Sequence, residues 1–277
     1  MSERRQKSLH RAKLLAGAPR CIYCEQPATT IEHMPPVGMF RSRLRLSGME
    51  YPSCEPCNVG TKAADVVACA MARIRATDIP DDWQTKELGR LIGSLDQLAP
   101  GLRDEMTRDG RAEQTWRWTP GGLLRPAVTV HADGPILKRH LTVFTAKLGM
   151  ALYREHVGEP LPPGGGVFTK WFLNAGLNQE QAEAMISILP IGGSLRQGRQ
   201  HSIEQFGYRY NCDDKHIVAA LAGFHSNLHA FVLATSTPAT YAFVRDRDSY
   251  VDYVGLSKLA ARLGSETGNR PDRRAAR

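Results

Sequence analysis

Apolar residues recur at helical spacing in several segments of this chain, and they predict its helices. The clearest pattern has its apolar positions at Leu141, Phe144, Leu148 and Leu152. Gly158 and the proline-rich residues after it end that pattern, as glycine and proline do at helix ends. Similar spacing predicts helices over 88–98 and 178–189, and the Ala- and Met-rich segment 61–75 should also be helical.

Alternation of apolar and polar residues predicts strands near the C-terminus. The segment 206–211 alternates aromatic residues with Gly, Arg and Asn, which is the two-residue period of a half-buried strand. Segments 228–235 and 241–244 continue this antiparallel pattern, and 116–130 looks extended around a turn at 120–122. Helices combined with antiparallel strands predict an α+β fold.

The chain is long enough for one large hydrophobic core or two modest ones. It has 277 residues, of which 42% are hydrophobic. No apolar run approaches the roughly 20 residues of a membrane span. The polar, basic start also lacks the apolar stretch of a signal peptide. We therefore expect a cytoplasmic protein without a membrane partner.

The formal net charge of +8 favours polyanionic partners, nucleic acid above all. Many proteins are basic for solubility alone, so this charge is only a weak indication. Basic residues gather in an N-terminal arm, 1–20, and in a tail, 264–277, that is expected to be disordered. Between them we expect a cysteine-rich module at 21–76, a helical and extended connecting region at 77–133, and an α+β C-terminal domain at 134–263.

Four of the six cysteines form two Cys-x-x-Cys pairs, Cys21 with Cys24 and Cys54 with Cys57. In a reducing cytosol such pairs are typical of metal ligands. Four thiolates are the set that tetrahedral structural Zn²⁺ prefers. The segment between the pairs is longer than a simple zinc ribbon needs, which suggests that the metal holds the ends of a loop with chemistry of its own.

That loop contains Glu32 and His33 in a short extended run that two prolines end. Asn58 follows the last cysteine, and Lys62 lies about one helical turn later. A helix that starts at Cys57 would hold both of them beside Glu32. Carboxylate and amide oxygens can hold a hard divalent ion, and a neutral imidazole can deprotonate water. These groups are the ones required for metal-assisted hydrolysis of a phosphodiester.

In these motifs the sequence resembles the zinc-containing branch of the His-Asn-His (HNH) endonucleases. The resemblance covers about residues 21–66 and rests on Cys-x-x-Cys, Glu-His-x-x-Pro and Cys-x-x-Cys-Asn-x-x-x-Lys. It implies a ββα-metal finger in which His33 is the general base, and Glu32 and Asn58 ligate a catalytic Mg²⁺ or Mn²⁺. The four cysteines would bind structural Zn²⁺. The implied activity is endonucleolytic hydrolysis of nucleic acid, with DNA as the expected substrate.

Three of these assignments have alternatives. The central Asn of the family has no counterpart between Gly48 and Tyr51. The alternative function is therefore a catalytically inactive zinc module that binds nucleic acid or a protein partner. Asn58 can instead cap its helix, because Asn is a favoured N-cap residue. Lys62 is interpreted as a phosphate ligand, although a solvated helix lysine has the same sequence pattern.

A row of basic residues, Arg41, Arg43 and Arg45, alternates with Ser42 and Leu44. If this segment is extended, all three guanidinium groups point the same way. They could then follow the phosphate backbone of a substrate. The alternative is an exposed edge strand that its charges protect from pairing with other chains.

Overall fold

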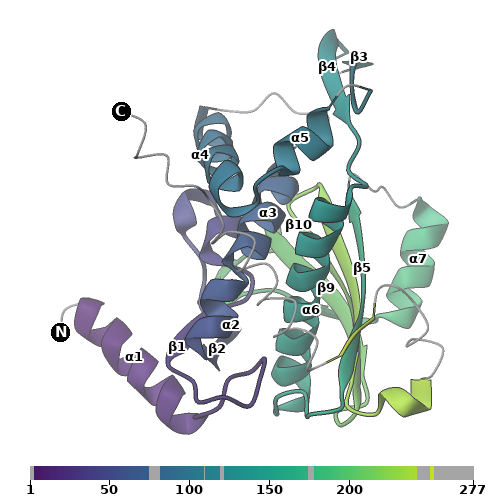
Figure 1. Cartoon of the computed structure of the whole chain (residues 1–277). Helices are drawn as coiled ribbons and strands as arrows, with labels where there is room; N and C mark the ends of the chain where they lie inside the picture. The colour runs from purple at the N-terminus through teal and green to yellow at the C-terminus, as the bar shows by residue number, and fades with distance from the viewer. Residues whose placement is uncertain are drawn as a thin grey trace.

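The structure is a computed structural model of the chain. It describes residues 3–74, 82–108, 110–118, 122–173, 178–241 and 250–252. The predicted basic tail at 264–277 and the predicted strand residues 242–244 lie outside this described part. The described residues form an α+β structure, as the sequence predicts (Figure 1).

The N-terminal part of the chain is built around a short β-hairpin. Its elements are α1 (Glu3–Gly17), β1 (Thr30–His33), η1 (Val37–Met39), η2 (Arg41–Arg43), β2 (Glu50–Ser53), α2 (Glu55–Gly60) and α3 (Lys62–Arg73). β1 and β2 pair antiparallel, and His33 lies opposite Glu50. Most of the predicted basic arm is helix α1, which contacts both strands of the hairpin.

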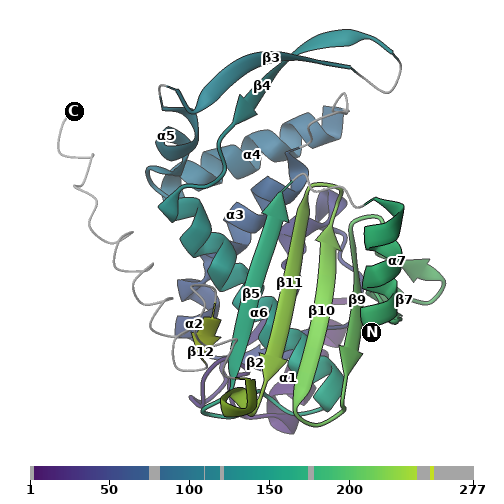
Figure 2. The ribbon, with the colours of Figure 1, turned by 90° about the vertical axis from the view of Figure 1, so that its right-hand side faces the viewer.

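A helical segment and a projecting ribbon come next. The elements are α4 (Asp82–Leu98), α5 (Leu102–Thr107), β3 (Ala112–Trp118) and β4 (Leu124–Val130). α4 packs against α3. β3 and β4 form a two-stranded sheet of their own, which projects from the body of the molecule (Figure 2).

An antiparallel sheet of six strands forms most of the C-terminal part. Its strands, in spatial order, are β12 (Tyr250–Asp252), β5 (Gly166–Leu173), β11 (Leu228–Thr235), β10 (Ile217–Phe224), β9 (Phe206–Cys212) and β6 (Ile191–Gly193). The long helix α6 (Pro135–Val157) lies on one face and α7 (Gln179–Ile188) on the other side (Figure 1). A small hairpin of β7 (Arg196–Gln197) and β8 (Gln200–His201) precedes β9, and η3 (Pro238–Tyr241) follows β11.

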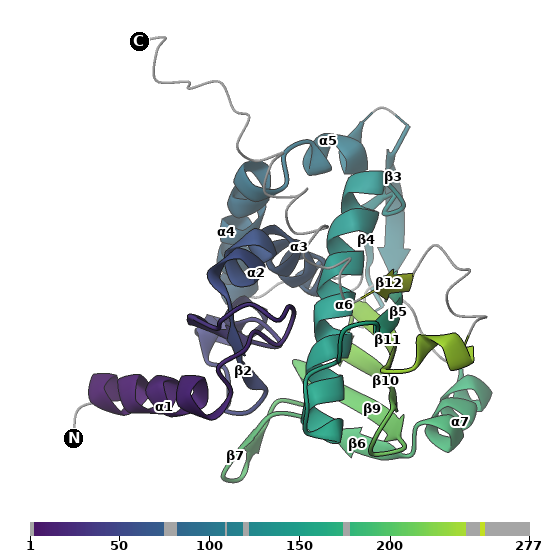
Figure 3. The same ribbon diagram turned by 60° about the horizontal axis from the view of Figure 1, so that its bottom comes forward.

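The sheet face against α6 forms the main core. Every second residue of β10 and of β11 is buried, because strand side chains point to opposite faces in turn. α6 is buried on most of its surface, since α3 packs on its side away from the sheet (Figure 3). Gly149 allows the close approach of α6 to β5, because a Cβ there would lie 2.4 Å from a methyl carbon of Val167.

Most of the predicted elements are present. α3, α4, α6 and α7 confirm the four predicted helices, and β3, β4, β9 and β11 confirm the extended segments that the structure describes. β5 and β10 were not expected from the sequence. β10 contains several alanines, and alanine is depleted in strands. Small side chains suit this strand because it packs against α6, a contact that the sequence does not reveal. No described helix is long and apolar enough to cross a bilayer.

A buried ion-pair cluster joins the N-terminal hairpin to the sheet domain. Lys147, in the middle of α6, has a fully buried side chain whose Nζ lies 2.8 Å from both carboxylate oxygens of Asp65 in α3. The same Nζ lies 3.3 Å from Oε1 of Glu32 in β1. Burial alone would lower the pKa of Lys147, but the two carboxylates outweigh it and raise that pKa. Lys147 therefore stays charged and holds three elements together.

We expect Lys147→Met to lower the free energy of unfolding by about 3–5 kcal/mol, because it leaves buried carboxylates without a counter-ion. The matched control is Lys138→Met on the exposed surface of the same helix, with an expected change of about 0.5 kcal/mol or less. Urea denaturation of both variants measures the difference. Adding Asp65→Asn and Glu32→Gln to Lys147→Met should restore much of the loss. Equal stability of the two single variants would contradict a structural role for Lys147.

Candidate functional site

The four cysteines of the two pairs come together at the end of the hairpin where β1 begins and β2 ends. Cys21 and Cys24 lie in the turn before β1, which an isolated bridge between Arg20 and Pro27 closes. Cys54 is the N-cap of α2, and Cys57 lies inside that helix. The backbone amide of Tyr23 donates to Sγ of Cys21 at 3.4 Å, an arrangement that favours a thiolate there.

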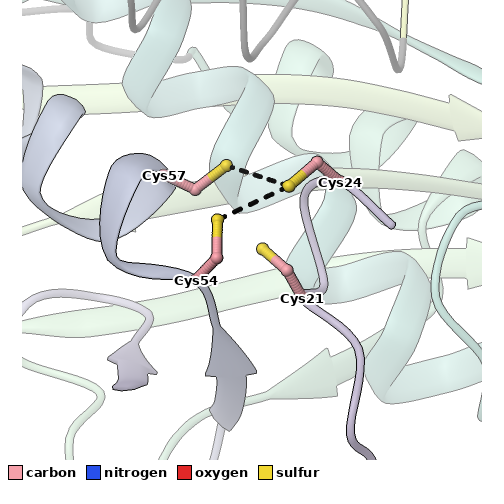
Figure 4. Close-up of side chains that lie close together, drawn as sticks. All are labelled: Cys21, Cys24, Cys54 and Cys57. Carbon is pink, nitrogen blue, oxygen red and sulfur yellow. Dashed lines mark hydrogen bonds between the residues drawn. The ribbon is translucent and has the colours of Figure 1, made fainter. Parts of the chain in front are cut away.

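The geometry of this cluster fits a tetrahedral metal site. The four sulfur atoms all lie within 4.8 Å of one another, and Sγ of Cys24 lies 3.5 Å from those of Cys54 and Cys57 (Figure 4). Zn–S bonds of about 2.3 Å place tetrahedral sulfurs about 3.8 Å apart, so Zn²⁺ needs only small movements. All four thiols are free rather than paired as disulfides. The cluster confirms the predicted gathering of the cysteines and is compatible with structural zinc.

Electrostatics also favour a cation at this cluster. A hydrogen bond from Cys57 lowers the pKa of Cys21 to about 4, whereas burial raises the pKa of Cys24 to about 12. The hydrogen bond to Cys21, with burial as the next cause, in turn raises the pKa of Cys57, so the cluster without an ion disfavours more than one thiolate among Cys21, Cys24 and Cys57. A bound divalent cation removes that restriction, because it stabilises several neighbouring thiolates at once.

Glu32 lies in a different environment from the one that the family resemblance implies. Its carboxylate is buried and paired with Lys147, and the Oε2 atom has no hydrogen-bond partner among the residues that the structure describes. Burial raises the pKa of Glu32 to about 7, against the opposing effect of Lys147. A carboxylate in this position is neutralised by an ammonium group or a proton and is not open to a metal ion.

Asn58 braces the hairpin through its side-chain amide. Nδ2 donates to Oγ1 of Thr30 at 3.0 Å and to the carbonyl of Ile31 at 3.2 Å. The alternative that Asn58 caps the helix is wrong, because it lies inside α2 and Cys54 holds the N-cap position. The helix is also not continuous, since Thr61 separates α2 from α3. Lys62 is thus in a different helix from Asn58, and its side chain is exposed.

The implied catalytic Mg²⁺ or Mn²⁺ does not fit Glu32 and Asn58 as the structure places them. Lys147 already holds the carboxylate of Glu32. The hydrogen bonds that Nδ2 of Asn58 donates to β1 fix the orientation of its amide group, and so the direction of the amide oxygen. Hard divalent ions need several oxygen ligands that are free to turn toward them. Glu32 and Asn58 therefore make structural contacts in place of the metal contacts that the family resemblance implies.

His33 lies on the other face of β1 from Glu32, because adjacent strand residues point in opposite directions. Its imidazole is half-buried at the end of the strand. Burial lowers the pKa of His33, and the nearby charge of Arg45 lowers it further, whereas Glu50 has the opposite effect. His33 is therefore neutral near pH 7, which is the form that a general base requires.

The predicted row of three arginines does not exist. Arg41 and Arg43 lie in the 3-10 turn η2, with φ of 50° at Ser42 and 60° at Arg43, so the segment is not extended. Their side chains are exposed. Arg45 has a buried side chain that donates to the carbonyls of Met34 and Gly48, among others. Arg45 holds the loop between the strands together, which leaves Arg41 and Arg43 as the candidates for phosphate contacts.

Several neighbours of the site were not predicted from the sequence. Glu50 lies opposite His33 across the hairpin, and Nε2 of His10 in α1 lies 2.9 Å from its Oε2. Glu50 falls in the segment where the central Asn of the resembled family has no counterpart, so a carboxylate at that point of the sequence was a signal that could have been used. Lys147 had no such signal, because it is far from the motif in sequence, and nothing in the sequence around Asp65 indicated that its carboxylate is buried.

We expect one Zn²⁺ per chain, bound by the cysteine cluster. Cys57→Ser should lose the metal and the folded hairpin together, because zinc binding and folding are coupled in such sites. The control, Cys212→Ser, changes a thiol in β9 that is outside the cluster and should keep one zinc. Elemental analysis gives the zinc content, and circular dichroism gives the fold. A zinc-free wild type with unchanged thermal stability would rule out this site.

Comparisons of the chain with families of known proteins, with curated proteins and with solved structures found no match. The cysteine cluster is compatible with zinc, but four clustered cysteines do not identify a family. Any assignment of function therefore depends on the residues of the site themselves.

Proposed function

We propose that this protein is an HNH-type endonuclease that hydrolyses phosphodiester bonds of nucleic acid, with DNA as the first substrate to test. The observation that supports this most is the position of His33. A neutral, half-buried imidazole ends β1 opposite a carboxylate, in a hairpin flanked by two Cys-x-x-Cys turns. The order of cysteine turn, β1, β2, cysteine turn and helix also agrees with the order that the resemblance implies.

In the proposed reaction, His33 accepts a proton from the water that attacks phosphorus, the P–O bond to the leaving oxygen breaks, and that oxygen takes a proton from solvent. Glu50, across the hairpin, stabilises the imidazolium that forms, because a nearby carboxylate raises the pKa of His33. Nε2–H of His10 donates to the same carboxylate and so holds it in place. This arrangement gives Glu50 the bracing role that the central Asn of the family would otherwise have.

The surroundings of His33 suit a polyanion. Helix α1 lies against the hairpin and exposes His10, Arg11 and Lys13. The whole chain carries a formal net charge of +8. Cationic groups beside a general base can both bind a phosphate backbone and stabilise the charge that develops on the transferred phosphate.

A second candidate function is a zinc module that binds nucleic acid or a protein partner without cleaving it. The contact between Glu32 and Lys147 favours this candidate, because it occupies the carboxylate that the family resemblance assigns to Mg²⁺ or Mn²⁺. No step of the proposed reaction therefore depends on that ion. Cleavage assays should compare added Mg²⁺, added Mn²⁺ and no added divalent ion.

His33→Ala should reduce the rate of cleavage by about 10²- to 10⁴-fold, the usual loss when a general base is removed. Zinc content and affinity for the substrate should stay close to those of wild type. His131→Ala, which changes an exposed histidine after β4, is the matched control and should cleave normally. The measurement is single-turnover cleavage of plasmid and of RNA. A wild-type protein that binds but never cleaves would establish the second candidate, and full activity of His33→Ala would exclude the proposed base.

Asn58→Ala should lower the free energy of unfolding by about 1–2 kcal/mol, because it removes two hydrogen bonds to β1. The divalent-ion concentration for half-maximal cleavage, if the reaction uses such an ion, should not change. Lys62→Ala, at an exposed position, serves as the control for stability. A raised ion requirement with unchanged stability would instead restore Asn58 as a metal ligand.

A further inference from the structure

A groove of about 380 Å³ lies between the loop that joins β1 to β2 and the β7–β8 hairpin. Its volume is in the range of small-ligand sites. One wall comes from the zinc-binding part of the chain and the other from the segment before β9. Figure 3 shows the β7–β8 hairpin projecting on the side of the molecule where β2 and α1 lie. The lining residues are Phe40, Leu44, Leu46, Arg199, Gln200, His201, Ser202, Glu204 and Gln205.

Specific hydrogen bonds hold the two walls in place. Ser202 is buried, and its Oγ accepts from the amide of Leu195 at 3.0 Å and donates to the carbonyl of Phe206 at 2.7 Å. These bonds fix the base of the β7–β8 hairpin. The backbone amide of Arg41 donates to Oε1 of Gln205 at 2.7 Å, so the two walls are joined directly. The groove is therefore part of the folded structure.

The rims of the groove are basic. The β7–β8 hairpin exposes Arg196, Arg199 and His201, with Arg196 and His201 opposite each other. The η2 turn exposes Arg41 and Arg43 beyond the other wall. Cationic side chains on both sides of a groove suit the phosphates of a strand that runs along it.

The interior of the groove differs from its rims. Leu44 and Leu46 form an apolar surface, and Leu44 is 75% exposed although it is a large apolar residue, whereas Phe40 is buried. Gln200, Glu204 and Gln205 add hydrogen-bonding groups of both kinds. An apolar surface beside amide and carboxylate groups suits the flat face and the polar edges of an unpaired base.

We infer that this groove binds an unpaired nucleotide segment of the nucleic-acid substrate, and that it delivers the neighbouring phosphate to His33. The inference rests on the proposed function for the identity of the ligand. Arg45 connects the two sites: its guanidinium lies 6.0 Å from the ring centroid of Phe40, and it donates at 3.0 Å to the carbonyl of Met34, the residue after His33. A base pair in a regular duplex does not expose a free face, so single strands, loops or frayed ends are the expected ligands.

The test measures binding of a fluorescent single-stranded DNA oligonucleotide by anisotropy at several salt concentrations. All variants carry His33→Ala, so that cleavage does not consume the probe. Arg199→Ala should weaken binding about fourfold at 0.15 M salt and reduce the salt slope by about 0.7, the value for one lost phosphate contact on a single strand. Leu44→Ser should weaken binding by up to about tenfold without changing the slope.

Arg125→Ala on the exposed ribbon strand β4 is the matched control and should not change affinity or slope. The inference is wrong if Arg199→Ala and Arg125→Ala behave alike, or if a duplex of the same sequence binds as tightly as the single strand. If the protein cleaves nucleic acid yet Leu44→Ser and Arg199→Ala bind normally, only the groove is excluded. If the protein binds no nucleic acid at all, the groove and the proposed function both fail.

Discussion

The buried contact of Lys147 with Asp65 and Glu32 is the interaction on which the arrangement of this molecule depends. It joins the hairpin, the helix that follows the second cysteine turn, and the helix that covers the sheet. A buried ammonium group is tolerated only where carboxylates compensate the loss of hydration. The same contact fixes the face of β1 that points inward, so His33 is directed to the other face. One ion-pair cluster thus fixes both the contact of the hairpin with α6 and the face of β1 on which His33 lies.

The cysteine cluster and the Lys147 cluster have complementary roles. The cysteines join the two ends of the hairpin segment, and Lys147 fixes that segment against α6. With both in place, the loop between β1 and β2 can extend to the β7–β8 hairpin and form the groove. A fixed loop matters because a base contributes to catalysis only when its substrate is held in reach. The proposed site is therefore shared between the cysteine-rich part of the chain and the sheet domain.

The sequence predicted the parts of this structure that depend on local pattern. Apolar spacing identified α6, and the spacing of the cysteines identified their cluster. Contacts between distant segments could not be predicted in this way. Lys147 has the sequence pattern of a solvated helix residue, and only its packing against Asp65 shows that it is buried. Ser42 and Arg43 have positive φ angles, which are uncommon for residues other than glycine. The sequence therefore did not indicate that the segment with the three arginines forms a turn.

A crystal structure of the zinc-loaded protein with an uncleavable single-stranded oligonucleotide would show whether nucleic acid meets this protein at His33. A phosphate is expected within hydrogen-bond reach of the His33 imidazole. The proposed binding mode also places an adjacent base in the groove between Leu44 and the β7–β8 hairpin. An oligonucleotide bound elsewhere, for example on the exposed Trp116 and Trp118 of the β3–β4 ribbon, with no phosphate near His33, would contradict it.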